Sequence, residues 1–168
     1  MKEVRIEKLT LNIGTGEPGD KLEKAKRLLA KITESKPIET KAKKRIPTWG
    51  VRPGLKIGCK VTLRKKRAEE VLAKILVARE NKLEESKFDK EGNVSFGIKE
   101  YLEVPGVDYD PQIGIIGLEM AVTLERMGFR IKRRHNQKRR IKQKQRITKE
   151  EAIRFMQEKF KVKVGEQA

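Results

Sequence analysis

Residues 36–64 read KPIETKAKKRIPTWGVRPGLKIGCKVTLR, and this stretch decides the fold. Apolar residues alternate with polar or small ones over 57–63, which predicts a strand with one buried face. A shorter strand is expected over 38–43. Two prolines and two glycines within 44–54 exclude a continuous sheet there and predict a long hairpin loop. Two strands joined in this way run antiparallel, so the stretch predicts an antiparallel sheet.

Three further segments place apolar residues at helical spacing. The first begins at Asp20, which forms an N-cap signature with Glu23, and it ends before Pro37. The second spans residues 68–79. The third begins at Thr148, which opens a capping box. Helices therefore accompany the strands along the chain.

The remaining strands complete the predicted fold. They are expected at 4–13, 94–102 and 118–124, with 129–132 pairing with the last of these and 82–93 forming a polar connector. The resulting order, β-α-β-β-α-β-β-α, predicts an α+β fold with a mainly antiparallel sheet and helices packed on one face. With a length of 168 residues, the chain is expected to form a single domain, residues 1–168.

The positive charge of the chain is concentrated in two segments. The formal net charge is +18. Residues 36–67 hold 12 Lys or Arg against one acid, Glu39, and residues 126–146 hold 11 Lys or Arg and no acid. The other 115 residues carry a net charge of −4. Because local phosphate neutralisation and counterion release drive polyanion binding, this pattern predicts a protein that binds nucleic acid at a defined place.

The hairpin loop combines cations with an aromatic side chain. Residues 44–54 include Trp49, the only tryptophan of the chain. An indole at the tip of a proline-fixed loop suits stacking on a base or ribose, and packing of the indole onto the core is the alternative. The loop residues expected to take part are Lys44, Arg45, Thr48, Trp49, Gly50 and Arg52. Lys41 and Lys43, beside the loop, are candidate rRNA-binding residues.

The strand after this loop predicts a second contact surface. Lys60, Thr62 and Arg64 share one face, and the apolar residues between them share the other. Cations and hydroxyls on an open sheet face suit RNA recognition, and a simple solvated face is the alternative. Cys59, on the apolar face, is expected to be a small core residue.

The second basic segment, residues 130–146, is expected to be a loop or arm that contacts RNA. It has few apolar residues to bury and no acid to neutralise it. A capped helix follows and fixes its end, which disfavours a nonspecific solubilising tail. Its candidate RNA-binding residues are Arg133, Arg134, Arg139 and Arg140.

The sequence offers no catalytic or metal-binding constellation. One cysteine and one histidine, Cys59 and His135, are too few for a disulfide or a zinc site. No nucleophile–base pair and no shielded carboxylate pair is present, so no enzyme is predicted. No run approaches 18 apolar residues and the N-terminal residues are charged, so we expect a cytoplasmic protein without a membrane span.

One glycine-rich loop resembles a dinucleotide-binding fingerprint. Gly14, Gly16 and Gly19 match G-x-G-x-x-G, but Glu17 and Asp20 would place carboxylates where a pyrophosphate meets backbone amides. The hairpin that follows also lacks the required parallel βαβ continuation. No cofactor is therefore expected. The two rivals of specific RNA binding are a nucleotide-cofactor enzyme and a generic DNA-compacting protein.

Four segments, in this order, resemble one universal family of large-subunit ribosomal proteins, the "five" family, which binds 5S rRNA in the central protuberance. They are VRIEKLTLNIGTG (4–16), the stretch 36–64 quoted above, VPGVDYDPQIGIIGLEMAVTL (104–124) and RITKEEAIRFMQEKF (146–160). The similarity spans nearly the whole chain. The basic region and the closing helix resemble the archaeal and eukaryotic form.

The resemblance implies a non-enzymatic, structural protein of the ribosome. Its implied partners are 5S rRNA, large-subunit rRNA, peptidyl-site tRNA, a small-subunit head protein and neighbouring large-subunit proteins. By that match Asn12, Lys36, Lys60 and Thr62 face 5S rRNA, and the loop 44–54 approaches the tRNA. The bridge to the small-subunit head is expected within 108–115, at Asp108, Tyr109, Asp110 and Gln112.

Overall fold

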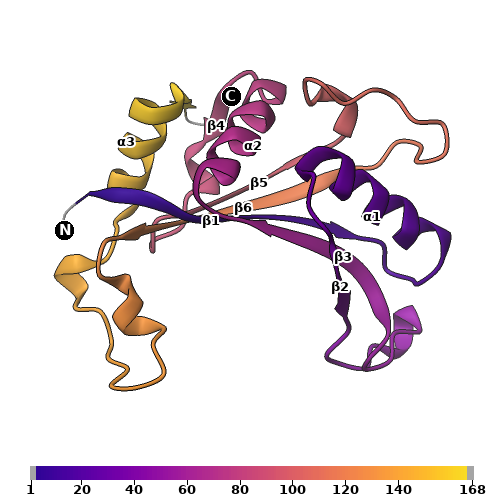
Figure 1. The fold of residues 1–168 in the computed structure, drawn as a ribbon, viewed down its shortest axis with the longest axis horizontal. Coiled ribbons are helices and arrows are strands. Elements are labelled where there is room, and N and C mark those ends of the chain that lie inside the picture. The colour runs from indigo at the N-terminus through magenta and orange to yellow at the C-terminus, as the bar shows by residue number, and fades with distance from the viewer. Residues whose placement is uncertain (1–2, 166–168) are drawn as a thin grey trace. The chain divides into compact units, whose positions relative to one another are not determined.

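The computed structural model describes residues 3–165 and has an α+β fold (Figure 1). Its main sheet has five antiparallel strands in the order β2-β3-β1-β6-β5. Their bounds are Ile38–Lys41 (β2), Lys56–Leu63 (β3), Val4–Gly14 (β1), Leu118–Arg126 (β6) and Asn93–Ile98 (β5). The α-helices of the described part are Asp20–Thr33 (α1), Lys65–Ala78 (α2) and Lys149–Phe160 (α3). The predicted fold class is confirmed.

The chain divides into two compact units, each built from segments that are distant in sequence. The hairpin unit comprises residues 10–63 and 97–120. The arm unit comprises, within the described residues, 3–9, 64–96 and 121–165. Most of the first basic segment therefore lies in the hairpin unit, and the second lies in the arm unit. That the chain acts as one domain stays a prediction.

In the hairpin unit, α1 packs its apolar stripe against β3. The buried apolar residues of this helix are Leu22, Ala25, Leu28, Leu29 and Ile32, at the spacing of one helix face. The two strands on either side of the loop pair antiparallel, with Ile38 opposite Lys60. The hairpin predicted from residues 36–64 is therefore confirmed, with β2 ending at Lys41 and β3 beginning at Lys56.

The prediction that Asp20 caps α1 is wrong. Asp20 is the first helical residue, Gly19 occupies the N-cap position, and no side chain caps the helix. The backbone of Gly19 has a φ of 118°, a conformation that residues with a Cβ rarely adopt. The turn therefore requires glycine at the cap. Asp20 and Glu23 lie in the first turn instead, where carboxylates favour the helix macrodipole.

Gly58 marks a close approach of three chain segments in the hairpin unit. A Cβ built on Gly58 would lie 2.7 Å from the backbone oxygen of Ile13 and 3.0 Å from Oγ1 of Thr40. Real Cβ atoms do not approach a backbone oxygen this closely. The pairing of β3 beside β1 and β2 at this point therefore depends on a residue without a side chain.

In the arm unit, two helices have the amphipathic character that the sequence predicts. The buried residues of α2 are Ala68, Val71, Leu72, Ile75 and Leu76. The capping box of α3 is confirmed: the N–H of Glu151 donates to Oγ1 of Thr148 at 3.4 Å, and the N–H of Thr148 donates to Oε2 of Glu151 at 3.2 Å. No helix within residues 3–165 is both long and apolar enough to cross a bilayer.

Three predictions about secondary structure need correction, and they concern residues 82–93, 129–132 and 94–102. Residues 82–93 are more than a connector, because Lys82–Glu84 (β4) pairs in parallel with Lys163–Gly165 (β7). Each of these strands has three residues, too few for alternation to show. Phe129–Lys132 is a 3-10 turn, not a strand, because Gly128 turns the chain with a φ of 96°. The strand expected to reach residue 102 ends at Ile98.

Candidate nucleic-acid interface

The loop between β2 and β3 is held in shape by its own backbone. The N–H of Ile46 donates to the oxygen of Val51 at 2.9 Å, and the N–H of Val51 donates back at 3.1 Å. Between them Pro47–Trp49 forms a 3-10 turn, which Gly50 ends in the left-handed conformation. Trp49 is 76% exposed at this tip. Packing of the indole onto the core is therefore excluded.

The cations around this loop have no intramolecular ion pair within the described residues. They are all exposed, and they are Lys41, Lys43, Lys44, Arg45 and Arg52. Glu39, the acid of this segment, binds other lysines: Nζ of Lys56 lies 2.7 Å and Nζ of Lys26 3.1 Å from its carboxylate. Hydrogen bonds from Lys56 and Lys26 lower the pKa of Glu39. The positive charge of the loop is therefore left uncompensated.

The face of β3 that carries polar residues is open, as the alternation predicts. Lys60 and Thr62 are exposed, whereas Cys59, Val61 and Leu63 are buried. Burial raises the pKa of the Cys59 thiol to about 11, so the thiol stays neutral and unreactive. The prediction that Cys59 is a core residue is confirmed.

Two further residues predicted to face RNA also lie in the hairpin unit. Lys36, just before β2, is exposed and forms no ion pair with any residue in 3–165. Asn12, on β1, is half-buried, and its Nδ2 donates to Oε2 of Glu119 at 3.4 Å. The amide of Asn12 is therefore already oriented by a neighbouring strand, and the hydrogen bond is long enough to exchange for another partner.

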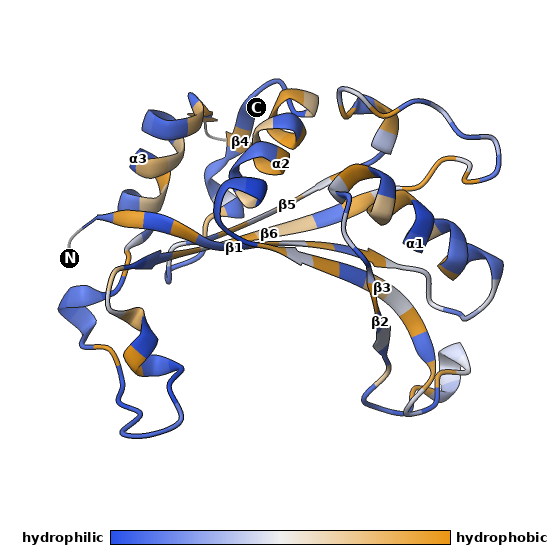
Figure 2. Cartoon of the chain, viewed as in Figure 1, coloured by the Kyte–Doolittle hydropathy of each residue, from blue (hydrophilic) through white to orange (hydrophobic). Residues whose placement is uncertain are grey.

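The basic arm, residues 130–146, has little regular structure. Its 3-10 turns are Phe129–Lys132 and Gln143–Gln145, and the arm is mostly hydrophilic (Figure 2). Nε of Arg134 donates to the backbone oxygen of Gln137 at 2.9 Å. Arg139 and Arg140 are exposed and form no ion pair with a described residue. The predicted irregular arm is confirmed.

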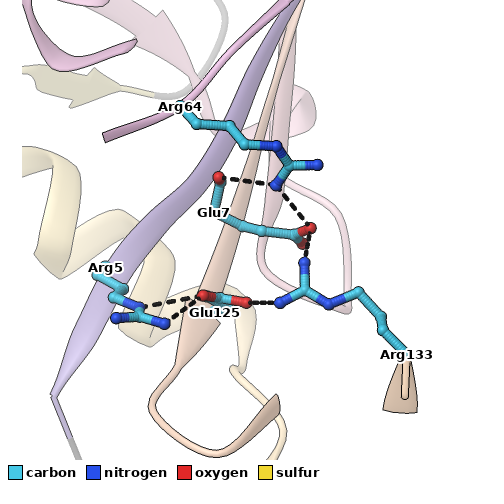
Figure 3. Close-up of polar contacts among 5 residues, drawn as sticks. All are labelled: Arg5, Glu7, Arg64, Glu125 and Arg133. Atoms are coloured by element: carbon cyan, nitrogen blue, oxygen red, sulfur yellow. Dashed lines mark hydrogen bonds and ion pairs between the residues drawn. The ribbon is translucent and has the colours of Figure 1, made fainter. Parts of the chain in front are cut away.

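A cluster of five charged residues joins this arm to the strands of its own unit (Figure 3). Glu125 on β6 is only 5% exposed and accepts from Nη2 of Arg5 at 2.7 Å and Nη2 of Arg133 at 2.5 Å. Glu7 on β1 pairs with Arg133 and, at 3.4 Å, with Nη1 of Arg64. Two of the predicted RNA-binding cations, Arg64 and Arg133, are therefore partly neutralised within the protein.

Sequence reasoning misses this cluster. The arm contains no acid, so its charge is expected to be free when the sequence alone is considered. The acids come from strands that are distant in sequence, since Glu7 is 126 residues away from Arg133. One local signal exists: Glu125 directly follows the buried Leu124, so β6 places a carboxylate where its alternation breaks.

The residues expected to bridge to the small subunit lie in the hairpin unit, tied to α1. Nζ of Lys31 donates to the backbone oxygen of Asp108 at 3.0 Å, and Nη1 of Arg27 donates to Oε1 of Gln112 at 3.2 Å. The N–H of Asp110 donates to the hydroxyl of Tyr101 at 3.1 Å. These bonds fix the conformation of the loop. The side chains of Tyr109 and Ile115 are 56% and 65% exposed.

Two backbone amides of the glycine-rich loop are already used within the protein. The N–H groups of Thr15 and Gly16 both donate to the oxygen of Ile57, at 2.9 and 3.1 Å. Glu17 pairs with Lys21 at 2.7 Å. Among the residues from 3 to 165, no group of three His, Cys, Asp or Glu could hold a metal ion.

Comparison with known proteins agrees with the geometry. Residues 1–52 match the family model of ribosomal protein L5, and residues 56–155 match the model of the C-terminal part of the same ribosomal family. The large ribosomal subunit protein uL5 of Sulfurisphaera tokodaii is 49% identical over 99% of this chain and 94% of its own. The uL5 proteins of Nanoarchaeum equitans and Methanosphaera stadtmanae are 48% and 44% identical, each over 98% of this chain and over 97% and 98% of their own. The chain therefore belongs to the L5 family in its archaeal form, a family of structural, non-enzymatic proteins of the large subunit of the cytoplasmic ribosome.

Proposed function

We propose that this protein binds 5S rRNA and helps to attach it to the large-subunit rRNA in the central protuberance. The observation that carries the proposal is a set of four exposed lysines in the hairpin unit that form no ion pair with a described residue. They are Lys36, Lys41, Lys43 and Lys60. Uncompensated cations of this kind release counterions when they meet phosphates, which is the main source of RNA affinity.

The open face of β3 supports RNA as the polyanion. Lys60 and Thr62 project from a sheet whose other face is buried, so their positions are fixed before binding. A rigid face with a cation, a hydroxyl and the amide of Asn12 can contact phosphates, 2′-hydroxyls and base edges. Generic DNA compaction requires no such surface.

The basic arm supplies phosphate contacts in this proposal. Arg134, Arg139 and Arg140 carry their charge on an irregular segment that can follow an RNA backbone. Arg133 and Arg64 contact phosphate through the donors that Glu7 and Glu125 leave free, because each guanidinium has five N–H groups.

The Trp49 loop contacts peptidyl-site tRNA. An indole that is 76% exposed beside Arg45 and Arg52 suits stacking on a base or ribose while the guanidinium groups hold phosphates. The loop conformation is fixed by the bonds between Ile46 and Val51, so little entropy is lost on binding.

The loop around residues 108–115 bridges to a protein of the small-subunit head. Asp108, Tyr109, Asp110 and Gln112 lie there, with exposed Tyr109 and Ile115 as the apolar part of the contact. The bonds from Lys31 and Arg27 give the loop a defined shape before any partner arrives. Neighbouring large-subunit proteins complete the set of proposed partners.

A filter-binding titration tests the central proposal. The full chain is expected to bind a 5S rRNA transcript far more tightly than duplex DNA of the same length at physiological salt. Equal affinity for the two nucleic acids over a salt titration would reject specific RNA recognition and leave a generic basic protein.

A further inference from the structure

A pocket of about 480 Å³ lies in the arm unit, where the basic arm meets β1 and β6. The strands contribute Lys8 and Thr123 to its wall, and the arm side contributes Phe129, Lys132, Arg140 and Ile141. Its volume falls within the range of roughly 300–1,000 Å³ that sites for small organic molecules occupy. Neither the family resemblance nor the charge pattern assigns this pocket a ligand.

The wall of the pocket combines an aromatic ring with an unused hydroxyl. Phe129 and Ile141 are both half-buried, so each keeps an accessible apolar surface. Thr123 is half-buried on β6, and its hydroxyl has no hydrogen-bond partner among the described residues. A flat ligand with polar edges can use both features, since its face stacks on the ring while its edge reaches the hydroxyl.

The charges around the pocket leave a cationic surplus. Five cations and three carboxylates line it, but the carboxylates are occupied: Glu7 and Glu125 by the cluster of Figure 3, and Glu91 by Arg146 at 3.7 Å. Lys8, Lys132 and Arg140 form no ion pair with any residue of 3–165. The pocket can therefore attract an anionic group without an opposing free carboxylate.

We propose that this pocket holds one unpaired nucleotide of ribosomal RNA, with its base stacked on Phe129 and its phosphate near Lys132 and Arg140. A simple anion would gain nothing from the aromatic ring of Phe129. A base within an RNA helix cannot stack on this ring, because the adjacent bases cover both of its faces. The proposal rests on the RNA binding proposed above and specifies one site within it.

The ion pairs of Arg133 with Glu7 and Glu125 fix the position of one wall of the pocket. Arg133 lines the pocket and is anchored to β6 by its 2.5 Å ion pair with Glu125. The arm wall is therefore in place before RNA binds, which reduces the entropy lost on binding.

The test compares binding of the full chain to deproteinised large-subunit RNA, with its 5S rRNA, for variants at position 129. Phe129→Leu removes the ring and keeps an apolar side chain, so the affinity is expected to fall about 5- to 150-fold at every salt concentration. Phe129→Tyr keeps the ring and is expected to bind like the wild type. Ile131→Ala is the matched control, because Ile131 lies in the same turn, is 40% exposed and does not line the pocket.

Arg140→Gln gives a second measurement that does not depend on the stability of the Phe129 variants, because Arg140 is exposed. Removal of one phosphate-binding cation is expected to reduce the slope of log K against log salt by about 0.7–0.9. If one nucleotide touches both residues, the affinity of the double variant falls by less than the two single variants together predict. Three results would each reject the proposed nucleotide site. They are additive losses of affinity in the double variant, an unchanged salt slope for Arg140→Gln, and wild-type affinity of Phe129→Leu. A wild-type chain that fails to prefer RNA over duplex DNA would instead overturn the proposed function.

Discussion

Trp49 occupies an unusual position for a tryptophan, because its side chain is 76% exposed. We predict that Trp49→Ala leaves the free energy of unfolding and the affinity for isolated 5S rRNA unchanged. In whole ribosomes the same change is expected to weaken peptidyl-site tRNA binding by about 1–3 kcal/mol, the contribution of one stacked base. Chemical denaturation and tRNA filter binding measure the two effects. Trp49→Phe, which keeps a ring, is the control, and a fall in unfolding free energy would mean that the indole packs in the fold.

Gly58 shows how one residue limits the packing of a sheet. Its missing side chain leaves room for the backbone oxygen of Ile13, which would lie 2.7 Å from any Cβ. We predict that Gly58→Ala lowers the free energy of unfolding by about 1–3 kcal/mol, because β3 must move away from β1.

Urea denaturation checks this prediction, with Gly14→Ala as the matched control. A Cβ at Gly14 would meet nothing within 4 Å, and its φ is not in the left-handed region. Gly14→Ala is therefore expected to be neutral. Equal stability of the two variants would contradict the close approach inferred at Gly58.

At the scale of elements, α3 fixes the end of the basic arm through its capping box. The reciprocal bonds between Thr148 and Glu151 satisfy backbone N–H groups at the start of the helix. We predict that Thr148→Ala lowers the free energy of unfolding by about 0.5–2 kcal/mol, whereas Thr148→Ser keeps the cap. Thermal unfolding followed by circular dichroism measures both, and an equal loss of stability in the two variants would argue against capping by the hydroxyl.

The elements also show where pattern reasoning succeeds and where it stops. The alternating stretch 57–63 is predicted within one residue, because one buried face imposes its period on the whole strand. The second helix is also predicted, but it begins three residues before the expected residue 68. Short elements such as β4 give no such signal. The pairing of Glu125 with Arg133 is not predictable either, since it depends on where β6 and the arm meet after folding.

For the whole molecule, the separation of charge predicts a steep salt dependence of RNA binding. If roughly 6–10 phosphates are bound, the affinity falls by about 10³–10⁵ between 50 and 200 mM salt. Replacing Lys41, Lys43 and Lys44 by glutamine is expected to reduce the slope by about 0.7–0.9 for each phosphate that is no longer neutralised.

The matched control for this experiment changes the net charge equally at ion-paired lysines. Lys21, Lys82 and Lys87 each pair with a nearby glutamate and lie outside both basic segments. Their replacement by glutamine is expected to leave the slope almost unchanged. Equal slopes for both triple variants would mean that net charge, not the placement of free cations, governs the affinity.

The sequence by itself determined the fold class, the hairpin and the irregular arm. These features are local or repeat along the chain, so composition and periodicity record them, whereas the family was indicated by the resemblance of four segments. Only the tertiary structure decided which cations are free, because ion pairs such as Glu7 with Arg133 join residues that are far apart in sequence. For the same reason it alone revealed the close approach at Gly58 and the pocket beside Phe129, since both arise where distant segments pack together.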